Sequence, residues 1–368
     1  MMRFLYLFVN LLFVIKYSLR VSAWFAAGSV VCYLLFAFFL MYGTAFFKKL
    51  NGRLLTILFS VLLIALAFGQ SLIDPYSLQV DRWSAIHHFI AKLFQGEYPY
   101  GAMTHLGGYG SPFPVWQLLH VPFYLLGNVA LSFLPAVILF LWTVYKLYDR
   151  QVCQQVFIFL FCSPAFLYEV MVRSDLMVNF LFCLSMVHLL IIYKIRISGH
   201  FWLVAFLCGL MMSTRLSAVI PLGIWLLKDY LMLPVGKKVY FPLAVAGIFI
   251  LTILPFVFWS SSLLDFSDHN PFVLQSRQGH LSDFIWMVPL FLLMALSWKN
   301  TREYHMRTSL FLFLLVCGIF AHNMIARNNW NMLFEATYDI TYFNMSLPFT
   351  IMALAVADSS PSCKWLKG

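Results

Sequence analysis

Charged residues are scarce in this chain of 368 residues. Lys, Arg, Asp and Glu together make up 10% of it, whereas 62% is hydrophobic. Ordinary soluble domains carry about 25% charged residues, so a soluble globular protein is excluded. Phenylalanine is abundant, with 39 copies, and Trp and Tyr often fall near the ends of apolar runs, where amphipathic rings favour the headgroup layer. The composition predicts a polytopic membrane protein.

Paired cysteines are lacking as well. The seven cysteines are scattered, most of them inside apolar runs, and none belongs to a CxxC pair. This spacing gives neither a disulfide framework nor a metal-ligand signature. The net charge of +10 does not indicate nucleic-acid binding, because the basic residues form short clusters between apolar runs and not one patch. No nucleic-acid partner is expected.

The first segment, MMRFLYLFVNLLFVIKYSLR, lacks the features of a cleaved signal peptide. Asn10 and Lys16 interrupt its apolar run, and no convincing small-residue cleavage site follows. We interpret it as a first helix.

The apolar runs predict about 11–12 transmembrane helices, since one crossing needs about 20 apolar residues. The stretch 113–127 is too short and proline-rich to cross and is expected to be interfacial or re-entrant. Residues 200–233 are either two short helices meeting at Ser213-Thr214-Arg215 or one long broken helix. The predicted spans are 4–19, 21–47, 54–73, 129–148, 152–168, 176–193, 200–214, 216–233, 240–260, 284–298, 308–326 and 338–357.

Charge predicts the orientation of these spans. One set of loops holds 16 of the 24 Lys and Arg residues and the other set holds 8, so the first set and both termini are expected in the cytoplasm. Ten of the 14 acidic residues, which were not used in this assignment, fall on the other side. The long connections 74–128, 261–283 and 327–337 also lie there. Any chemistry is therefore expected on the extracytoplasmic face of the cell membrane.

The first large outer loop contains an amphipathic helix in the stretch DRWSAIHHFIAKLFQGEYPYG, residues 81–101. Its apolar residues recur at helical spacing, with polar residues on the opposite face. A helix of this kind lies in the membrane plane with its apolar stripe in the acyl boundary. Gly96 at a C-cap position and Pro99 end it. The stripes are formed by Trp83, Ile86, Phe89, Ile90, Leu93 and Phe94 on the apolar face and by Asp81, Ser84, His88 and Lys92 on the polar face.

This pattern resembles the GT-C class of membrane glycosyltransferases. The resemblance is carried by an acid shortly after an early span, the amphipathic helix, GEYPY, and the stretch YGSPFPVWQLLHVPFYLLG. Two later stretches also resemble sequence segments of such enzymes. They are SPAFLYEVMVRSDLMVN (163–179) and MMSTRLSAVIPLGIWLL (211–227). It is closest to the branch that uses polyprenyl-phosphate sugars, such as mannosyltransferases. The resemblance runs from about residue 54 to 357. It implies one transmembrane glycosyltransferase domain, 1–368, with 1–53 as extra N-terminal helices, 74–128 as the catalytic outer loop and 261–283 as the second outer loop.

The resemblance implies a general base in the first large outer loop, and this role falls on Asp81. The base takes a proton from the acceptor hydroxyl while that oxygen attacks the anomeric carbon with inversion. Asp74 is the competing carboxylate, but it precedes Pro75 and is more typical of a turn former. Asp81 alternatively serves only as the N-cap of the amphipathic helix.

The leaving phosphate needs cations near the same surface, because arginine binds phosphate in a bidentate manner. We expect this role for arginines of the outer loops, with snorkelling or local ion pairs, such as Arg173 with Asp175 or Glu169, as the alternative. The polar loop 261–284 offers further groups for sugar hydroxyls, and Phe272 is a candidate for stacking on a sugar face. The candidate substrate-binding residues are Arg82, Tyr98, Tyr100, Arg173, Asp175, Arg215, His269, Asn270, Gln275 and Arg277.

No cofactor is indicated. Asp268, His269 and His280 are compatible with a divalent metal, but they lack tight ligand spacing. The expected partners are a polyprenyl-phosphate-linked sugar donor, a lipid or glycan acceptor, and the membrane.

Three other functions fit the same composition. A transporter or flippase of a lipid-linked sugar is one, although no internal repeat is visible and the ionisable groups gather at one face. An O-antigen ligase or polysaccharide polymerase, which uses a diphosphate donor, is another. The third is a non-catalytic partner in a cell-envelope complex.

Overall fold

A computed structural model describes residues 1–42, 52–260, 269–276, 285–331, 333–335 and 338–356. Within these ranges the regular structure is helical, apart from one isolated antiparallel bridge between Met103 and Tyr109. Helices suit apolar segments because they satisfy every backbone hydrogen bond within the segment. The all-α prediction is confirmed for this part of the chain. The α-helices are α1 (Met2–Ser18), α2 (Ala23–Tyr42), α4 (Gly52–Ser71), α5 (Arg82–Gln95), α6 (Pro114–Leu119), α7 (Val121–Leu125), α8 (Phe133–Leu147), α9 (Arg150–Phe161), α10 (Pro164–Met171), α11 (Leu176–Ile192), α12 (Phe201–Met212), α13 (Val219–Leu231), α14 (Val235–Trp259), α15 (Pro271–Ser276), α16 (Met287–Ser297), α17 (Thr301–Ala326) and α18 (Leu347–Ala355).

Short 3₁₀ helices cap or join several of these elements. They are η1 (Pro75–Ser77), η2 (Pro99–Gly101), η3 (Val129–Ser132), η4 (Leu216–Ala218) and η7 (Ile340–Met345).

Five helical segments are long and apolar enough to cross a membrane. They are Ala23–Tyr42, Arg53–Ser71, Val129–Leu147, Val235–Trp259 and Thr301–Ala326. A sixth arises if α9 and α10, which are bent by 60° at Ser163-Pro164, form one broken span. The other predicted spans correspond to shorter helices. By length and composition, the prediction of 11–12 crossings is thus supported for five or six of them.

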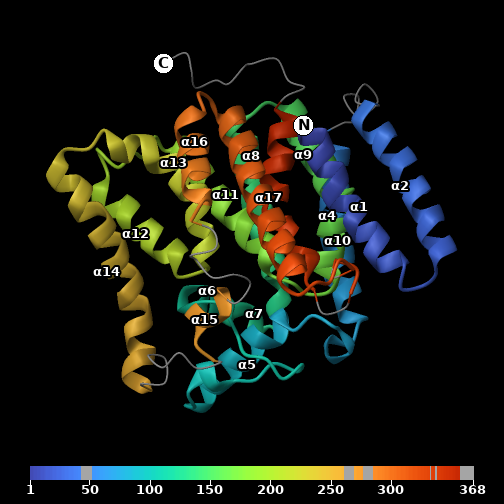
Figure 1. Cartoon of the computed structure of the whole chain (residues 1–368), viewed down its shortest axis with the longest axis horizontal. Helices are drawn as coiled ribbons and strands as arrows, with labels where there is room; N and C mark the ends of the chain where they lie inside the picture. The colour runs from blue at the N-terminus through green and yellow to red at the C-terminus, as the bar shows by residue number, and fades with distance from the viewer. Residues whose placement is uncertain (43–51, 261–268, 277–284, 332, 336–337, 357–368) are drawn as a thin grey trace.

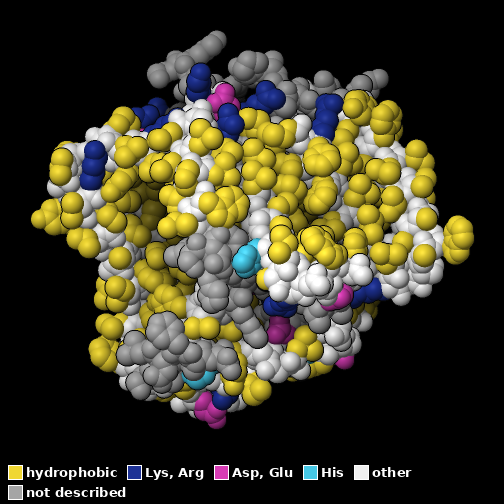
Figure 2. Space-filling model, viewed as in Figure 1, with side chains coloured by type: hydrophobic (Ala, Val, Ile, Leu, Met, Phe, Trp, Pro, Cys, Tyr) yellow, Lys and Arg dark blue, Asp and Glu magenta, His cyan; other side chains and the backbone are white. Residues whose placement is uncertain are grey.

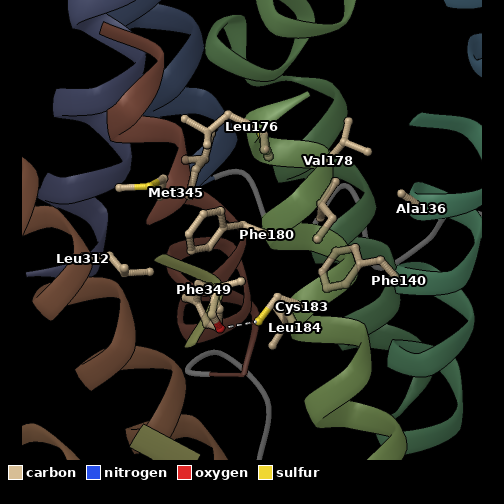
Figure 3. Close-up of a cluster of buried hydrophobic side chains, with 14 of the residues drawn as sticks. Ala136, Phe140, Leu176, Val178, Phe180, Cys183, Leu184, Leu312, Met345 and Phe349 are labelled. Carbon is tan, nitrogen blue, oxygen red and sulfur yellow. Dashed lines mark hydrogen bonds between the residues drawn. The ribbon is translucent and has the colours of Figure 1, made fainter. Parts of the chain in front are cut away.

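The centre of the bundle is built around α11. This helix is apolar on all sides, and such helices are buried on all sides. Figure 3 shows Phe180 of α11 in one buried cluster with Phe140 of α8, Phe349 of α18, Leu312 of α17 and Met345 of η7.

The first two helices differ in how they join this bundle. The Asn10 carboxamide oxygen of α1 accepts hydrogen bonds from the Ser163 hydroxyl (2.6 Å) and the Ala165 N–H (3.1 Å), so α1 is fixed to the start of α10. Helix α2 lies at the edge of the molecule (Figure 1) and packs mainly on α1. Of the region predicted as extra N-terminal helices, α1 is therefore part of the core.

The two ends of the bundle differ in charge. Figure 2 shows Lys and Arg side chains along the upper edge, a hydrophobic band across the middle, and most of the visible Asp and Glu near the lower end. Helices α5, α6, α7 and α15 gather at that lower end, opposite the N-terminus (Figure 1). This is the charge asymmetry that the sequence predicts for the two membrane faces.

Candidate functional site

A polar cavity of about 390 Å³ lies among segments that are far apart in the sequence. The start of α5, the loop before α6, the break between α12 and α13, the end of α17, and η7 all contribute to its walls. The lining residues are Asp81, Arg82, Ala85, Tyr109, Ser111, Pro112, Arg215, Arg327, Tyr338, Asp339 and Tyr342. Of the residues predicted from the sequence, Asp81, Arg82 and Arg215 line it.

Asp81 precedes α5 but does not cap it with its side chain. Its backbone carbonyl accepts the Ala85 N–H (2.9 Å), and no side-chain capping bond forms. Its Oδ2 instead accepts a hydrogen bond from the Thr104 hydroxyl at 2.9 Å. Asp81 therefore stands at the N-cap position of α5, as the alternative predicts, but its side chain bonds Thr104 and not the helix. Asp74 does cap a turn, because its Oδ1 accepts the Tyr76 N–H (3.1 Å), as predicted for a turn former.

A tight turn aims Thr104 at Asp81. Thr104 and Gly108 are joined by a backbone hydrogen bond of 2.7 Å, and the Gly108 N–H also donates to the Thr104 hydroxyl oxygen (3.0 Å). Gly107 within the turn has φ +80°, a left-handed conformation that glycine adopts without strain. The hydroxyl proton of Thr104 is thus left for the carboxylate.

Helix α5 buries most of its apolar stripe against the protein. Trp83, Ile86, Phe89 and Ile90 are all buried, and Phe89 contacts Tyr100 and Phe256 with ring centroids 4.9 and 5.8 Å apart. The prediction that this stripe lies in the acyl boundary is wrong for these four residues, because other elements of the bundle cover them, whereas Phe94 at the end of the stripe is 58% exposed. The predicted stop is confirmed, since Gly96 is a left-handed C-cap with φ 72°.

The predicted break at residues 213–215 is confirmed, and it receives the interfacial stretch. A helix end leaves carbonyls without intrahelical partners. The Phe113 and Trp116 N–H groups donate to the carbonyls of Thr214 and Ser213, both at 3.3 Å. The interfacial stretch 113–127 forms α6 and α7 and not a crossing. This docking leaves Arg215 in extended backbone beside the cavity.

Four charged side chains form a network of ion pairs at the cavity wall. Arg215 Nη2 lies 2.9 and 2.6 Å from the two Asp175 carboxylate oxygens. Arg82 Nη2 donates to Asp339 Oδ2 at 2.7 Å, and its Nη1 lies 4.0 Å from Asp175. The Trp116 indole N–H donates to Asp175 Oδ2 at 2.5 Å. The network joins α5, α6, α11, η7 and the break after α12.

The network neutralises its own members. Burial alone raises the pKa of Asp175, but Arg215 and Arg82 outweigh this effect and lower that pKa to about 2. Arg82 and Arg215 are therefore each held by a carboxylate. Arg327 differs, since it is exposed at the end of α17 and, among the residues the structure describes, has no carboxylate within 4 Å.

Three predicted binding residues lie away from the cavity. Arg173 has φ 58° and donates to the carbonyls of Gln70 (2.6 Å) and Ile73 (3.1 Å) at the end of α4, so it makes neither of the ion pairs considered for it. Tyr100 is buried, and its hydroxyl donates to the Pro112 carbonyl at 3.4 Å. Tyr98 packs near Trp259.

The second polar loop supports the cavity from outside. Gln275 of α15 accepts the Leu216 N–H (2.8 Å) and donates to the Ser111 carbonyl (2.7 Å), so it ties two lining segments together. Asn270 accepts the Phe272 N–H (2.8 Å), and the His269 ring lies 5.7 Å from the Tyr109 ring. Phe272 packs against Phe113 at 4.8 Å and not in the cavity.

Arg277, Asp268 and His280 lie outside the described residues. Within the described ranges, no group of three or more His, Cys, Asp or Glu side chains is placed to hold a metal ion.

Several lining residues were not predicted. Tyr109 and Ser111 lie in the first large outer loop, inside the stretch YGSPFPVWQLLHVPFYLLG, but were not singled out, and neither was Thr104, which contacts Asp81 from the same loop. Arg327 and Asp339 bound the polar stretch RNNWNMLFEATYD, so the local signal was the polarity of that stretch. Comparisons of the chain with protein-family models, curated proteins and solved structures find no match.

Proposed function

We propose that this protein is an integral membrane glycosyltransferase with a GT-C-like architecture. It moves a sugar, mannose or a similar hexose, from a polyprenyl-phosphate donor to a lipid or glycan acceptor. The reaction takes place at the extracytoplasmic face of the cell membrane, with both termini in the cytoplasm. The observation that carries this proposal is the cavity beside Asp81 and Arg327 at the end of the bundle away from the basic loops.

The charges of the cavity suit group transfer. Arg82, Asp175, Arg215 and Asp339 neutralise one another, which leaves the Asp81 carboxylate and the Arg327 guanidinium. A free carboxylate serves as a general base, and a free guanidinium stabilises a phosphate leaving group. Thr104 holds the carboxylate in place while leaving its remaining lone pairs available.

The proposed reaction is a single inverting displacement. Asp81 takes the proton of the acceptor hydroxyl as that oxygen forms its bond to the anomeric carbon. The bond from this carbon to the phosphate oxygen breaks, and its electron pair stays on the polyprenyl phosphate. Arg327 binds the resulting anion, which therefore leaves without being protonated. The tyrosines Tyr109, Tyr338 and Tyr342 offer ring faces and hydroxyls to the sugar.

The test is sugar transfer by purified protein in lipid nanodiscs, with a polyprenyl-phosphate-hexose donor. Asp81→Asn is expected to lower the transfer rate about 10²–10⁴-fold and to leave the thermal unfolding temperature close to that of the wild type. Asp74→Asn is the matched control, because Asp74 caps a turn outside the cavity. An Asp81→Asn variant with the wild-type rate would refute the role of Asp81. Passage of the intact donor across the bilayer without bond formation would favour the transporter.

A further inference from the structure

A second hollow lies on the side of the helix bundle, between α12 and α14. It is near the end of the molecule that carries the basic loops. It has a volume of about 680 Å³ and is lined by Phe201, Trp202, Lys237, Tyr240, Leu243 and Ala244. We call it the α12–α14 groove. Three of these side chains stand well out from the protein, Trp202 being 72% exposed, Tyr240 67% and Leu243 61%. Its volume falls in the range of ligand pockets, about 300–1,000 Å³.

The groove follows from how α12 and α14 pack. They pack closely at Gly209, where an added Cβ would lie 2.6 Å from Ile248 Cγ2. Towards the start of α12, the Phe201 and Phe241 rings meet with centroids 5.6 Å apart. Small Gly209 at one point and two large aromatic rings at another thus form the contact between these helices.

The backbone next to Lys237 is held by a hydrogen bond from Tyr230 of α13. Pro242 lies inside α14 and has no N–H, so the Lys238 carbonyl loses its intrahelical donor. The Tyr230 hydroxyl replaces that donor at 2.9 Å. Lys238 is thus part-buried beside α13, whereas Lys237 is exposed and lines the groove.

We propose that the α12–α14 groove binds one anionic phospholipid. The acyl chain lies along Leu243 and Ala244, and the phosphate headgroup meets the Lys237 ammonium. Trp202 and Tyr240 have the amphipathic rings that favour the headgroup layer. Basic side chains near a membrane surface attract anionic lipids by about 1 kcal/mol each. This proposal does not depend on the proposed glycosyltransferase activity.

Another surface groove of the same protein lacks a basic residue and serves as a comparison for the expected preference for anionic lipid. The surface between α4 and α8 has a hollow of about 490 Å³, lined by Phe59, Ser60, Leu63, Ile64, Ala67, Phe68, Leu134 and Ile138. It contains no basic residue, so it lacks a group that distinguishes an anionic from a zwitterionic lipid. The α12–α14 groove combines a comparable apolar surface with a cation.

The experiment compares phosphatidylglycerol with phosphatidylcholine of the same acyl chains. Each lipid is titrated onto the full-length protein in detergent and its binding is measured by native mass spectrometry. A diazirine in the acyl chain then locates the bound lipid by cross-linking. We expect a preference for phosphatidylglycerol, with cross-links at residues 201–202 and 240–244. Lys237→Ala should reduce the preference about fivefold, which corresponds to ~1 kcal/mol.

Two variants make the result decisive. Lys238→Ala removes the same charge one residue away and should retain the preference, since Lys238 does not line the groove. Ala244→Phe fills the groove and should reduce the cross-links from both lipids there. Equal binding of the two lipids, or an unchanged preference in Lys237→Ala, would overturn the proposal. So would cross-links confined to the α4–α8 surface.

Discussion

At the scale of single residues, Arg215 and Arg327 line the same cavity but have opposite electrostatic surroundings. Arg215 and Asp175 are buried, with side chains 7% and 5% exposed. Removing Arg215 takes the nearest cation from the buried Asp175, which keeps Arg82 at 4.0 Å and the Trp116 N–H, and breaking a buried ion pair costs up to about 3–5 kcal/mol. Arg215→Ala should therefore destabilise the protein by up to this amount. Arg327→Ala should change stability by less than about 0.5 kcal/mol, as expected for an exposed side chain.

Binding of the donor should depend on Arg327 even though stability does not. Arg327→Ala is expected to weaken binding of a polyprenyl-phosphate analogue while its unfolding temperature in detergent stays near the wild-type value. Thermal unfolding followed by circular dichroism and a titration with the analogue provide the two measurements. An Arg215→Ala variant that unfolds like the wild type would show that the buried pair does not hold the site together.

The sequence predicted part of the cavity at this scale. Asp81 was singled out through the resemblance to GT-C glycosyltransferases, and Arg215 because it lies at a break between two apolar segments, which a single sequence shows directly. The pairing of Arg82 with Asp339 spans 257 positions in the chain, and no local pattern encodes such a contact. The local pairing of Arg173 with Asp175, considered as the alternative to phosphate binding, does not form, because the Arg173 side chain donates to the Gln70 carbonyl of α4.

At the scale of helices, glycine contacts control how closely elements pack. Gly209→Ala should destabilise the contact between α12 and α14, since the new methyl group meets Ile248 at 2.6 Å and the Val245 carbonyl at 3.0 Å. Overpacking of this kind costs about 1–3 kcal/mol. Gly247→Ala is the matched control, because no atom lies within 4 Å of its added Cβ.

Unfolding in a mixed detergent series would measure both variants. Gly247→Ala should equal or exceed the wild type, as alanine is the better helix former. If Gly209→Ala were as stable as Gly247→Ala, α12 and α14 would have room to separate at no cost in free energy. The α12–α14 groove, which opens away from this contact, would then have no fixed shape.

Helix positions were the most predictable feature, because an apolar run bounded by polar residues is a local property. The break after Met212 was predicted in the same way, whereas the break before Pro164 was not, because 152–168 was predicted as one span. The element against which an apolar face packs could not be predicted from a local pattern. The stripe of α5 has the pattern of a membrane-surface helix, yet Phe89 and Ile90 face protein. Helix α1, with Asn10 and Lys16 inside an apolar run, is likewise fixed by distant partners, such as the Tyr338 carbonyl 2.5 Å from Lys16 Nζ.

At the scale of the whole molecule, most of the Lys and Arg side chains visible in Figure 2 lie at one end, and helices α5 and α6, which border the polar cavity, lie toward the other (Figure 1). The positive-inside rule then predicts that the cavity faces away from the cytoplasm. A membrane-impermeant maleimide tests this in intact cells expressing cysteine-free protein with one introduced cysteine. Glu97→Cys, beyond the end of α5, should be labelled without permeabilisation, and Arg302→Cys, at the start of α17, only after it. Both residues are exposed in the folded protein, so access to solvent alone does not distinguish them.

This experiment bears on the proposed function as well as on topology. A sugar acceptor and a lipid-linked donor can meet at Asp81 only on the side of the membrane that the cavity faces. Labelling of Arg302→Cys in intact cells, with protection of Glu97→Cys, would put the cavity in the cytoplasm. The extracytoplasmic reaction would then be excluded, while the buried charge network and the predicted stability effects would stand, because they depend on contacts within the protein and not on its orientation.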